Sequence, residues 1–118
     1  MSLWGCLSSA ESWLWRDHLA ELVALFCAEY AGAGGPVLDP AELHEHLLYY
    51  SAMMGLLWLT DAPPRILREV PDLGDCADRF DPRILASETA RVQLQMMTNF
   101  LSFWQAEDLT ARIAARFG

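Results

Sequence analysis

Apolar and polar residues follow one another along this chain with the spacing of α-helices. Over residues 9–31 the apolar side chains return every three or four positions, at Leu19, Leu22, Val23, Phe26 and Tyr30, which places them on one helical face. Ser8, with Glu11 three residues later, predicts a capping box at the start of this helix. The glycine-rich run 31–36 ends in a proline, so we expect the helix to stop there.

A second helix is predicted over 40–60. Asp39 is a good N-cap, Pro40 suits the first helical position, and Glu42 occupies the capping-box position. The thirteen residues 47–59 are uncharged and apolar on all sides, which is typical of a central helix buried on most of its faces. Thirteen residues are too few to span a bilayer, and the prolines after Ala62 are expected to end the helix.

Three further helices are predicted at 64–70, 82–105 and 108–116. Asp81 and Pro82 repeat the cap-plus-proline pattern. The helix over 82–105 carries two apolar stripes, one with Val92, Met96, Phe100 and Phe103 and another with Leu94, Met97, Leu101 and Trp104. Two stripes indicate either a wide buried face or a core face plus a partner face. No segment shows strand alternation, so we predict one all-α domain, an irregular bundle of four to five helices.

Charge narrows the class of partner. The 118 residues carry a net charge of −8, and all eight basic residues are arginine. Without a basic stripe to neutralise phosphates, we expect no nucleic-acid binding. Residues 1–64 hold one arginine against eight carboxylates, so this acidic half either attracts a cationic ligand or basic partner or is simply a solvated surface.

Cysteine usage and the N-terminus indicate the compartment. Cys6, Cys27 and Cys76 are widely spaced and form no CxxC pair, which argues against a disulfide scaffold and a zinc ribbon. The first residues lack the positively charged region of a secretory signal. With no membrane-spanning run either, we expect a cytoplasmic protein that binds no membrane.

Candidate chemistry along the chain is weak. His44 and His46 sit beside Glu42 and Glu45, but residues two apart point in different directions on a helix, so a shared metal ion is not expected. No serine lies in a GxSxG elbow, and the Asp72-Leu73-Gly74 stretch is best interpreted as a turn. We therefore predict no catalytic residue, no metal and no cofactor, and leave open whether the chain is part of an enzyme.

The tryptophans are the strongest candidates for a binding surface, because indole rings are enriched at interfaces and in ligand pockets. Trp58 is expected in the core, whereas three tryptophans near the N-terminus are hard to bury within one small domain. The predicted partner or ligand surface comprises Trp4, Trp13, Trp15, Glu42, Glu45 and Trp104.

Two stretches resemble the helical C-terminal lobe of aminoglycoside phosphotransferase-like (choline-kinase-like) proteins. The first is FCAEYAGAGGPVLDPAELHEHL at 26–47, where a helix ends in a Gly-Gly-Pro turn and the next begins at Pro-x-Glu. The second combines Asp81-Pro82-Arg83-Ile84 with QLQMMTNFLSFWQ at 93–105. The resemblance covers residues 13–108 and implies the substrate-side helical scaffold of such an enzyme.

The chain departs from this family in every part that performs phosphoryl transfer. It has no lysine, no glycine-rich loop after a strand and no His-x-Asp catalytic loop, and each of these is needed to hold and transfer a phosphoryl group. The resemblance thus implies a lobe that is inert alone and that meets a missing kinase-like N-terminal lobe. Two alternatives stay open: a stand-alone interaction module that forms a homodimer, and an acidic protein that binds a ligand or a basic partner.

Overall fold

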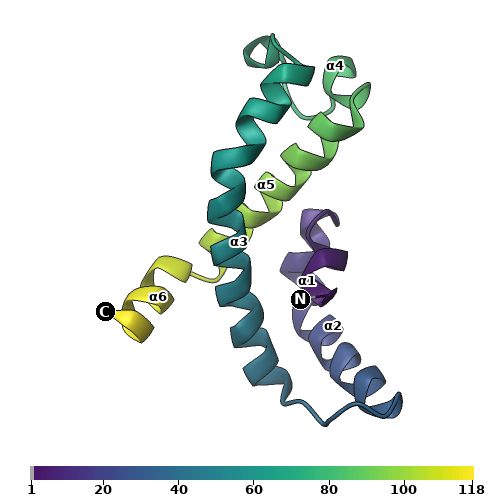
Figure 1. Ribbon diagram of the computed structural model, residues 1–118, viewed down its shortest axis with the longest axis vertical. Coiled ribbons are helices and arrows are strands. Elements are labelled where there is room, and N and C mark those ends of the chain that lie inside the picture. The colour runs from purple at the N-terminus through teal and green to yellow at the C-terminus, as the bar shows by residue number, and fades with distance from the viewer. Residues whose placement is uncertain (1) are drawn as a thin grey trace.

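The computed structural model describes residues 2–118, and its regular elements are helical (Figure 1). In chain order they are α1 (Ser2–Leu7), α2 (Ser12–Gly32), α3 (Pro40–Glu69), the 3-10 turn η1 (Leu73–Asp75), α4 (Pro82–Leu85), α5 (Glu88–Ala106) and α6 (Leu109–Phe117). No strand occurs among residues 2–118. The prediction of an all-α bundle is therefore confirmed.

The longest helix, α3, forms the spine of the molecule. Its 30 residues extend over about 45 Å at the usual helical rise, close to the longest dimension of 48 Å. Helix α5 crosses it, α1 and α2 lie on one side, and α6 lies on the other (Figure 1). The crossing of α3 and α5 is very close, because a Cβ atom added at Gly55 would stand 1.9 Å from the Phe100 ring.

Two separate groups of buried residues hold the helices together. The larger group, called the large core below, joins α1, α2, the first half of α3, the end of α5 and the start of α6. It comprises Trp4, Leu7, Trp15, Leu19, Val23, Cys27, Leu47, Leu48, Ala52, Phe103 and Leu109. The small core lies at the other end of the spine and comprises Ala62, Ile66, Val70, Ile84 and Ala90.

Two predicted helix starts are confirmed. The Asp39 carboxylate accepts a hydrogen bond from the Ala41 amide at 2.9 Å, and Pro40 takes the first helical position of α3. At the start of α4 the Asp81 carboxylate accepts from the Arg83 amide at 3.0 Å. In both places an aspartate satisfies an amide that has no partner within the helix.

The predicted helix over 9–31, with its capping box at Ser8, is wrong at its start. The chain forms α1 first and begins α2 only at Ser12, with Glu11 as an N-cap that makes no side-chain capping bond. The Ser8 hydroxyl instead donates to the Gly5 carbonyl at 3.2 Å, inside the end of α1. The link between the two helices is held by Asn99 on α5, whose amide donates to the carbonyls of Ser8 and Ala10.

The expected break at Pro63 and Pro64 is also wrong, because α3 continues through both prolines to Glu69. A proline inside a helix removes one backbone hydrogen bond and crowds the preceding turn. Here Ala62 and Ile66, on either side of the two prolines, are fully buried in the small core. This tertiary packing outweighs the local penalty and joins the predicted segments 40–60 and 64–70 into one helix.

The predicted helix over 82–105 is interrupted. Helix α4 ends at Leu85 and α5 begins at Glu88. Ser87 lies between them in an extended conformation, and its hydroxyl accepts a hydrogen bond from the Ala90 amide at 3.1 Å. This serine cap turns the chain so that Ile84 and Ala90 both reach the small core. The last helix, predicted at 108–116, is found at Leu109–Phe117.

The molecule is flat and open for its size. Its extents are 48 × 36 × 22 Å and its radius of gyration is 16.2 Å, whereas a compact domain of this length has a radius of gyration of about 13.5 Å. No helix of the described chain has both the length and the apolarity needed to cross a membrane.

Candidate functional site

One face of α3 exposes apolar side chains to solvent. Met53, Leu56, Leu57 and Leu67 are each between 49% and 58% exposed, and we call these four residues the α3 face. The first three are spaced i, i+3 and i+4, so they lie side by side on the helix surface. The opposite side of the helix is buried, with Leu48, Ala52 and Ile66. The expectation that the run 47–59 is buried on most sides therefore holds for ten of its thirteen residues, which are buried or partly buried, and fails on this one face.

The α3 face is also free of charge over much of its length. Residues 46–60 contain no Asp, Glu, Arg or Lys, and the first ion pair beyond them joins Asp61 and Arg65 at 2.9 Å. A half-exposed leucine by itself is ordinary on a protein surface. Three adjacent apolar side chains on an uncharged stretch of helix form a patch of the kind that marks an interaction surface.

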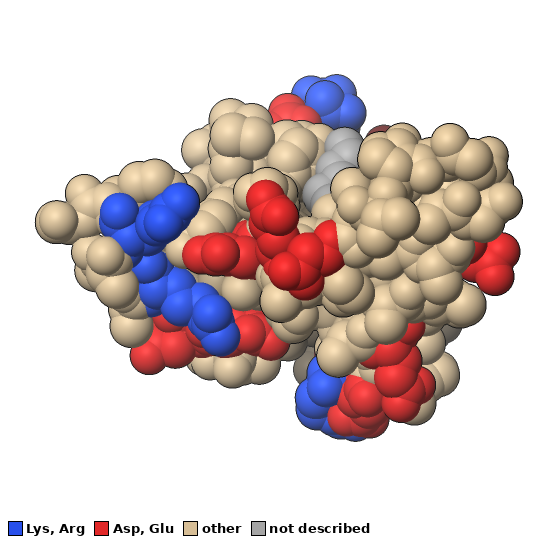
Figure 2. Space-filling model, turned by 90° about the horizontal axis from the view of Figure 1, so that it is seen from below, with Lys and Arg blue, Asp and Glu red and all other residues tan. Residues whose placement is uncertain are grey.

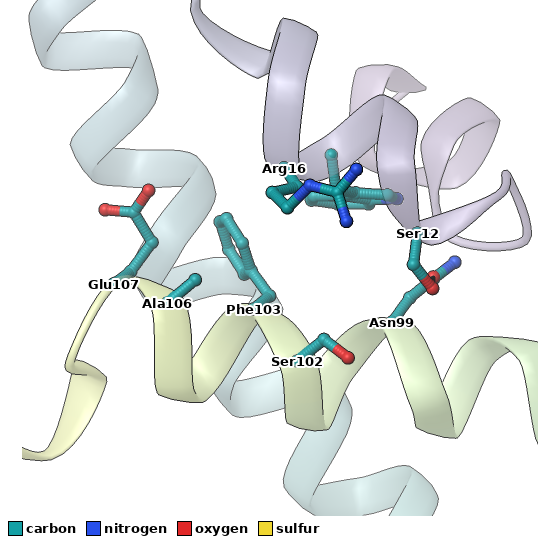
Figure 3. Close-up of a pocket in the computed structure, with 8 residues that line it drawn as sticks. Ser12, Arg16, Asn99, Ser102, Phe103, Ala106 and Glu107 are labelled. Atoms are coloured by element: carbon teal, nitrogen blue, oxygen red, sulfur yellow. Dashed lines mark hydrogen bonds between the residues drawn. The ribbon is translucent and has the colours of Figure 1, made fainter.

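A second candidate site is a cleft of about 370 Å³ between α2 and the C-terminal part of α5 (Figure 3). Its apolar side is formed by Trp15 and Phe103, which are buried and meet edge to face with their ring centroids 4.9 Å apart. Its polar side is formed by Ser12, Arg16, Asn99 and Ser102, while Ala106 and Glu107 close the far end. The cleft thus combines a rigid aromatic surface with a few polar groups, as small-molecule sites do.

Asn99 fixes the wall of this cleft. Its side-chain oxygen accepts hydrogen bonds from the Ser12 hydroxyl at 2.9 Å and from the Gln95 amide at 3.1 Å. Its side-chain nitrogen donates to the carbonyls of Ser8 and Ala10. An asparagine has two donor hydrogens and two acceptor lone pairs, so every one is used. Asn99 therefore positions α1 and α2 against α5 and has no capacity left for a ligand.

Arg16 supplies the positive charge of the cleft. Its Nε and Nη2 atoms donate to the two carboxylate oxygens of Asp17, at 2.6 and 2.8 Å. These hydrogen bonds, with the attraction between the two charges, raise the pKa of Arg16 above its ordinary value. The guanidinium extends over the cleft between Ser12 and Phe103 (Figure 3). At the other end, the Glu107 carboxylate is held by Arg112 at 3.3 Å.

Two of the six predicted surface residues are not on the surface. Trp4 and Trp15 are both buried in the large core. Trp4 stacks on Trp58 with their ring centroids 4.8 Å apart, and the Trp15 indole donates to the Leu7 carbonyl at 2.6 Å. Helix α1 folds back over α2 and α3 and supplies the cover, so the expectation that these rings are hard to bury is wrong for both.

The other four predicted residues are accessible to different degrees. Trp13 is 50% exposed and stands edge-on to His18. Trp104 is half-buried, and its indole donates to the Thr110 hydroxyl at 2.8 Å. Glu42 and Glu45 are exposed near the start of α3. These four residues are distributed over α2, α3 and α5. The structure does not bring them together into one site, and their role as a partner surface stays a prediction.

Charge is unevenly placed on the face seen from below in Figure 2. Carboxylates gather near the middle of this face, and arginines lie on the side of α6, which carries Arg112 and Arg116. Among the described residues no three His, Cys, Asp or Glu side chains come together as metal ligands. His44 lies 3.8 Å from Glu107, whereas His46 lines a shallow groove with Val37 and Leu43.

The residues that sequence reasoning missed are those of the α3 face and, apart from Trp15, those of the cleft. The apolar run 47–59 did contain a signal, because a domain of this size has few neighbours with which to cover every side of one helix. The polar side of the cleft had none, because Ser12 and Asn99 are 87 residues apart in the chain.

Comparison with protein-family models, with curated proteins and with solved structures finds no match to this chain.

Proposed function

We propose that this protein is a non-catalytic helical interaction module that pairs with a second copy of itself through the α3 face. The observation that carries the proposal is the exposure of Met53, Leu56 and Leu57 on the central helix. Burying such side chains releases roughly 25 cal/mol for each square ångström of apolar surface removed from water. When a partner covers the α3 face, the burial of these side chains therefore contributes favourably to the free energy of association.

The accessible surface area of the molecule supports the proposal of a partner with an interface of standard size. The molecule exposes 7325 Å² at a mass of 13.3 kDa, and monomeric proteins of this mass expose about 6,450 Å² on average. The difference of about 900 Å² is close to the ~800 Å² that each partner buries in a standard interface. A flat chain with this much excess surface is better explained as half of an assembly than as a complete globular unit.

A second copy is favoured as the occupant because the face is uncharged. Two chains of net charge −8 repel each other wherever carboxylates meet, and the stretch 46–60 has none. A two-fold axis brings the same patch of both chains together, which is the commonest arrangement of soluble oligomers. The phosphotransferase-like resemblance would place a missing lobe against this chain instead, and it stays a prediction.

The first experiment is analytical ultracentrifugation over the micromolar range with a charge introduced into the face. In Leu57→Glu, two new carboxylates face each other near the two-fold axis, and we expect dimer dissociation to become at least ~10-fold easier. Leu25→Glu is the matched control, because Leu25 is 56% exposed on α2, away from the α3 face, and gains the same charge.

We expect the unmodified chain and Leu25→Glu to be dimeric and Leu57→Glu to be monomeric, with the same helical content by circular dichroism. An unmodified chain that is monomeric throughout this range would overturn the proposal. Equal dimerisation of the two glutamate variants would overturn it as well.

A further inference from the structure

We propose that the cleft between α2 and α5 binds a small monocarboxylate that carries a flat apolar group. Its volume of about 370 Å³ lies within the range of about 300–1,000 Å³ that small-molecule sites occupy. The cleft is separate from the α3 face, so this inference does not depend on the pairing of two copies. Its ligand class follows from which groups of the lining remain available.

The apolar part of the ligand fits against Trp15 and Phe103. Both residues are largely buried, at 8% and 5% exposed, and the edge-to-face contact between their rings fixes their orientation. The indole nitrogen of Trp15 is occupied by the Leu7 carbonyl, so the ring offers only apolar surface to the cleft. A flat aromatic or aliphatic group therefore replaces water over these rings without leaving a polar group unpaired.

The carboxylate of the ligand fits between Arg16 and Ser102. Asp17 occupies Nε and Nη2 of Arg16, and Nη1 makes no hydrogen bond within the described chain, which leaves two hydrogens to donate. The Ser102 hydroxyl lies across the cleft from the guanidinium (Figure 3). A carboxylate is the natural acceptor for two such donors, and Arg16 is the only arginine among residues 1–64, which contain no lysine.

The remaining charges limit the ligand to one negative charge. Asp17 already neutralises part of the guanidinium charge, which disfavours a dianion such as a phosphate monoester. Glu107 at the far end points away from the cleft and pairs with Arg112 (Figure 3), so it offers no partner for a second carboxylate. The ligand therefore places its carboxylate between Arg16 and Ser102 and its apolar group toward Ala106.

The cleft is preformed, which lowers the cost of binding. All four hydrogen-bonding positions of Asn99 are filled from α2, α5 and the segment between α1 and α2. The wall therefore does not have to be ordered by the ligand.

Titration by NMR with three small aromatic probes tests the ligand class. Benzoate, benzyl alcohol and benzylamine share the flat ring and differ in charge. We expect benzoate to shift the resonances of Trp15 and Ser102 and to bind about tenfold more tightly than benzyl alcohol, as one charge-assisted hydrogen bond provides. Benzylamine is expected to bind most weakly. Benzylamine binding as tight as that of benzoate would overturn the proposal.

Three variants locate the site. Arg16→Gln is expected to remove the preference for benzoate over benzyl alcohol, and Ala106→Trp to abolish the binding of both by filling the cleft. Arg91→Gln is the matched control, because Arg91 is exposed on α5 outside the cleft. Benzoate binding that Arg16→Gln leaves unchanged would contradict the assignment. Repeating the titration on Leu57→Glu separates this result from the state of association.

Discussion

The large core and the small core are held together by different kinds of interaction. In the large core, aromatic rings and the two buried amides of Gln95 and Asn99 connect segments up to 91 residues apart. In the small core, five aliphatic residues within 62–90 pack together, and Arg83 ties the neighbouring loop by contacts with Asp72, Asp81 and the Asp75 carbonyl. The first region depends on long-range burial, whereas the second depends on local packing and surface charge.

This difference ranks the two regions by their sensitivity to change. A buried polar group that loses its partners costs the full penalty of desolvation, whereas an exposed ion pair contributes little and is screened by salt. We therefore expect the largest effects in the large core, smaller ones at the crossing between the cores, and the smallest at Arg83.

The strongest test of the large core is Asn99→Leu. This change leaves the Ser8 carbonyl without its donor and the Ser12 hydroxyl without its acceptor, while the Ala10 carbonyl and the Gln95 amide keep only the hydrogen bond to each other. It should lower the free energy of unfolding by about 3 kcal/mol. Urea denaturation at one fixed protein concentration measures it. Thr98→Ala, the exposed neighbour on α5, is the control and should stay within about 0.5 kcal/mol of the unmodified chain. Equal effects of the two changes would refute the role of Asn99.

The crossing between the two cores is tested by Gly55→Ala. The added Cβ atom meets the Phe100 ring at 1.9 Å, so α3 and α5 must move apart, at a cost of about 2 kcal/mol. The control is Gly74→Ala, because a Cβ atom there meets nothing within 4 Å. Combining Gly55→Ala with Phe100→Leu should cost less than the sum of the single changes. Strict additivity of the two changes would argue against the close contact.

The smallest of these effects is expected at Arg83→Gln. Hydrogen bonds from Arg83 lower the pKa of Asp81 to about 2 and also lower the pKa of Asp72. Because both carboxyls titrate lower in the folded chain, their stabilisation is complete above the ordinary aspartate value of ~3.9 and is lost as the pH falls toward the folded values.

The difference in denaturation midpoint between the unmodified chain and Arg83→Gln should therefore be largest at neutral pH and should shrink as the pH falls from about 4 toward 2. Chemical denaturation across this pH range measures it. Arg68→Gln, an exposed arginine on α3, should show no such dependence. A difference that stays constant with pH would contradict the ion pairs at Arg83.

The local parts of the fold could be predicted from the sequence. The caps at Asp39 and Asp81 depend on groups within three residues, and such short patterns are visible in any sequence. The all-α class follows from spacing alone. The continuity of α3 through Pro63 and Pro64 was not predictable in this way, because it is stabilised by packing against α4 and α5, which follow later in the chain.

The candidate sites were less predictable than the helices. Trp4 was predicted on the surface because it lies near the N-terminus, yet Tyr50 and Trp58 from α3 cover it. Asn99 carries no local sign of its role, because three of its four partners lie 87 to 91 residues away. Contacts over such distances are set by how helices pack and leave no spacing pattern in the sequence.

The two prolines within α3 have a mechanical consequence. Neither Pro63 nor Pro64 carries an amide hydrogen, so the carbonyls of Leu59 and Thr60 have no donor four residues further along the helix. This gap lies beyond the close crossing at Gly55, where α3 enters the small core with Ala62. Because two successive helical hydrogen bonds are absent, bending α3 in this turn costs less than bending it elsewhere, and we expect any flexing of the spine to occur here.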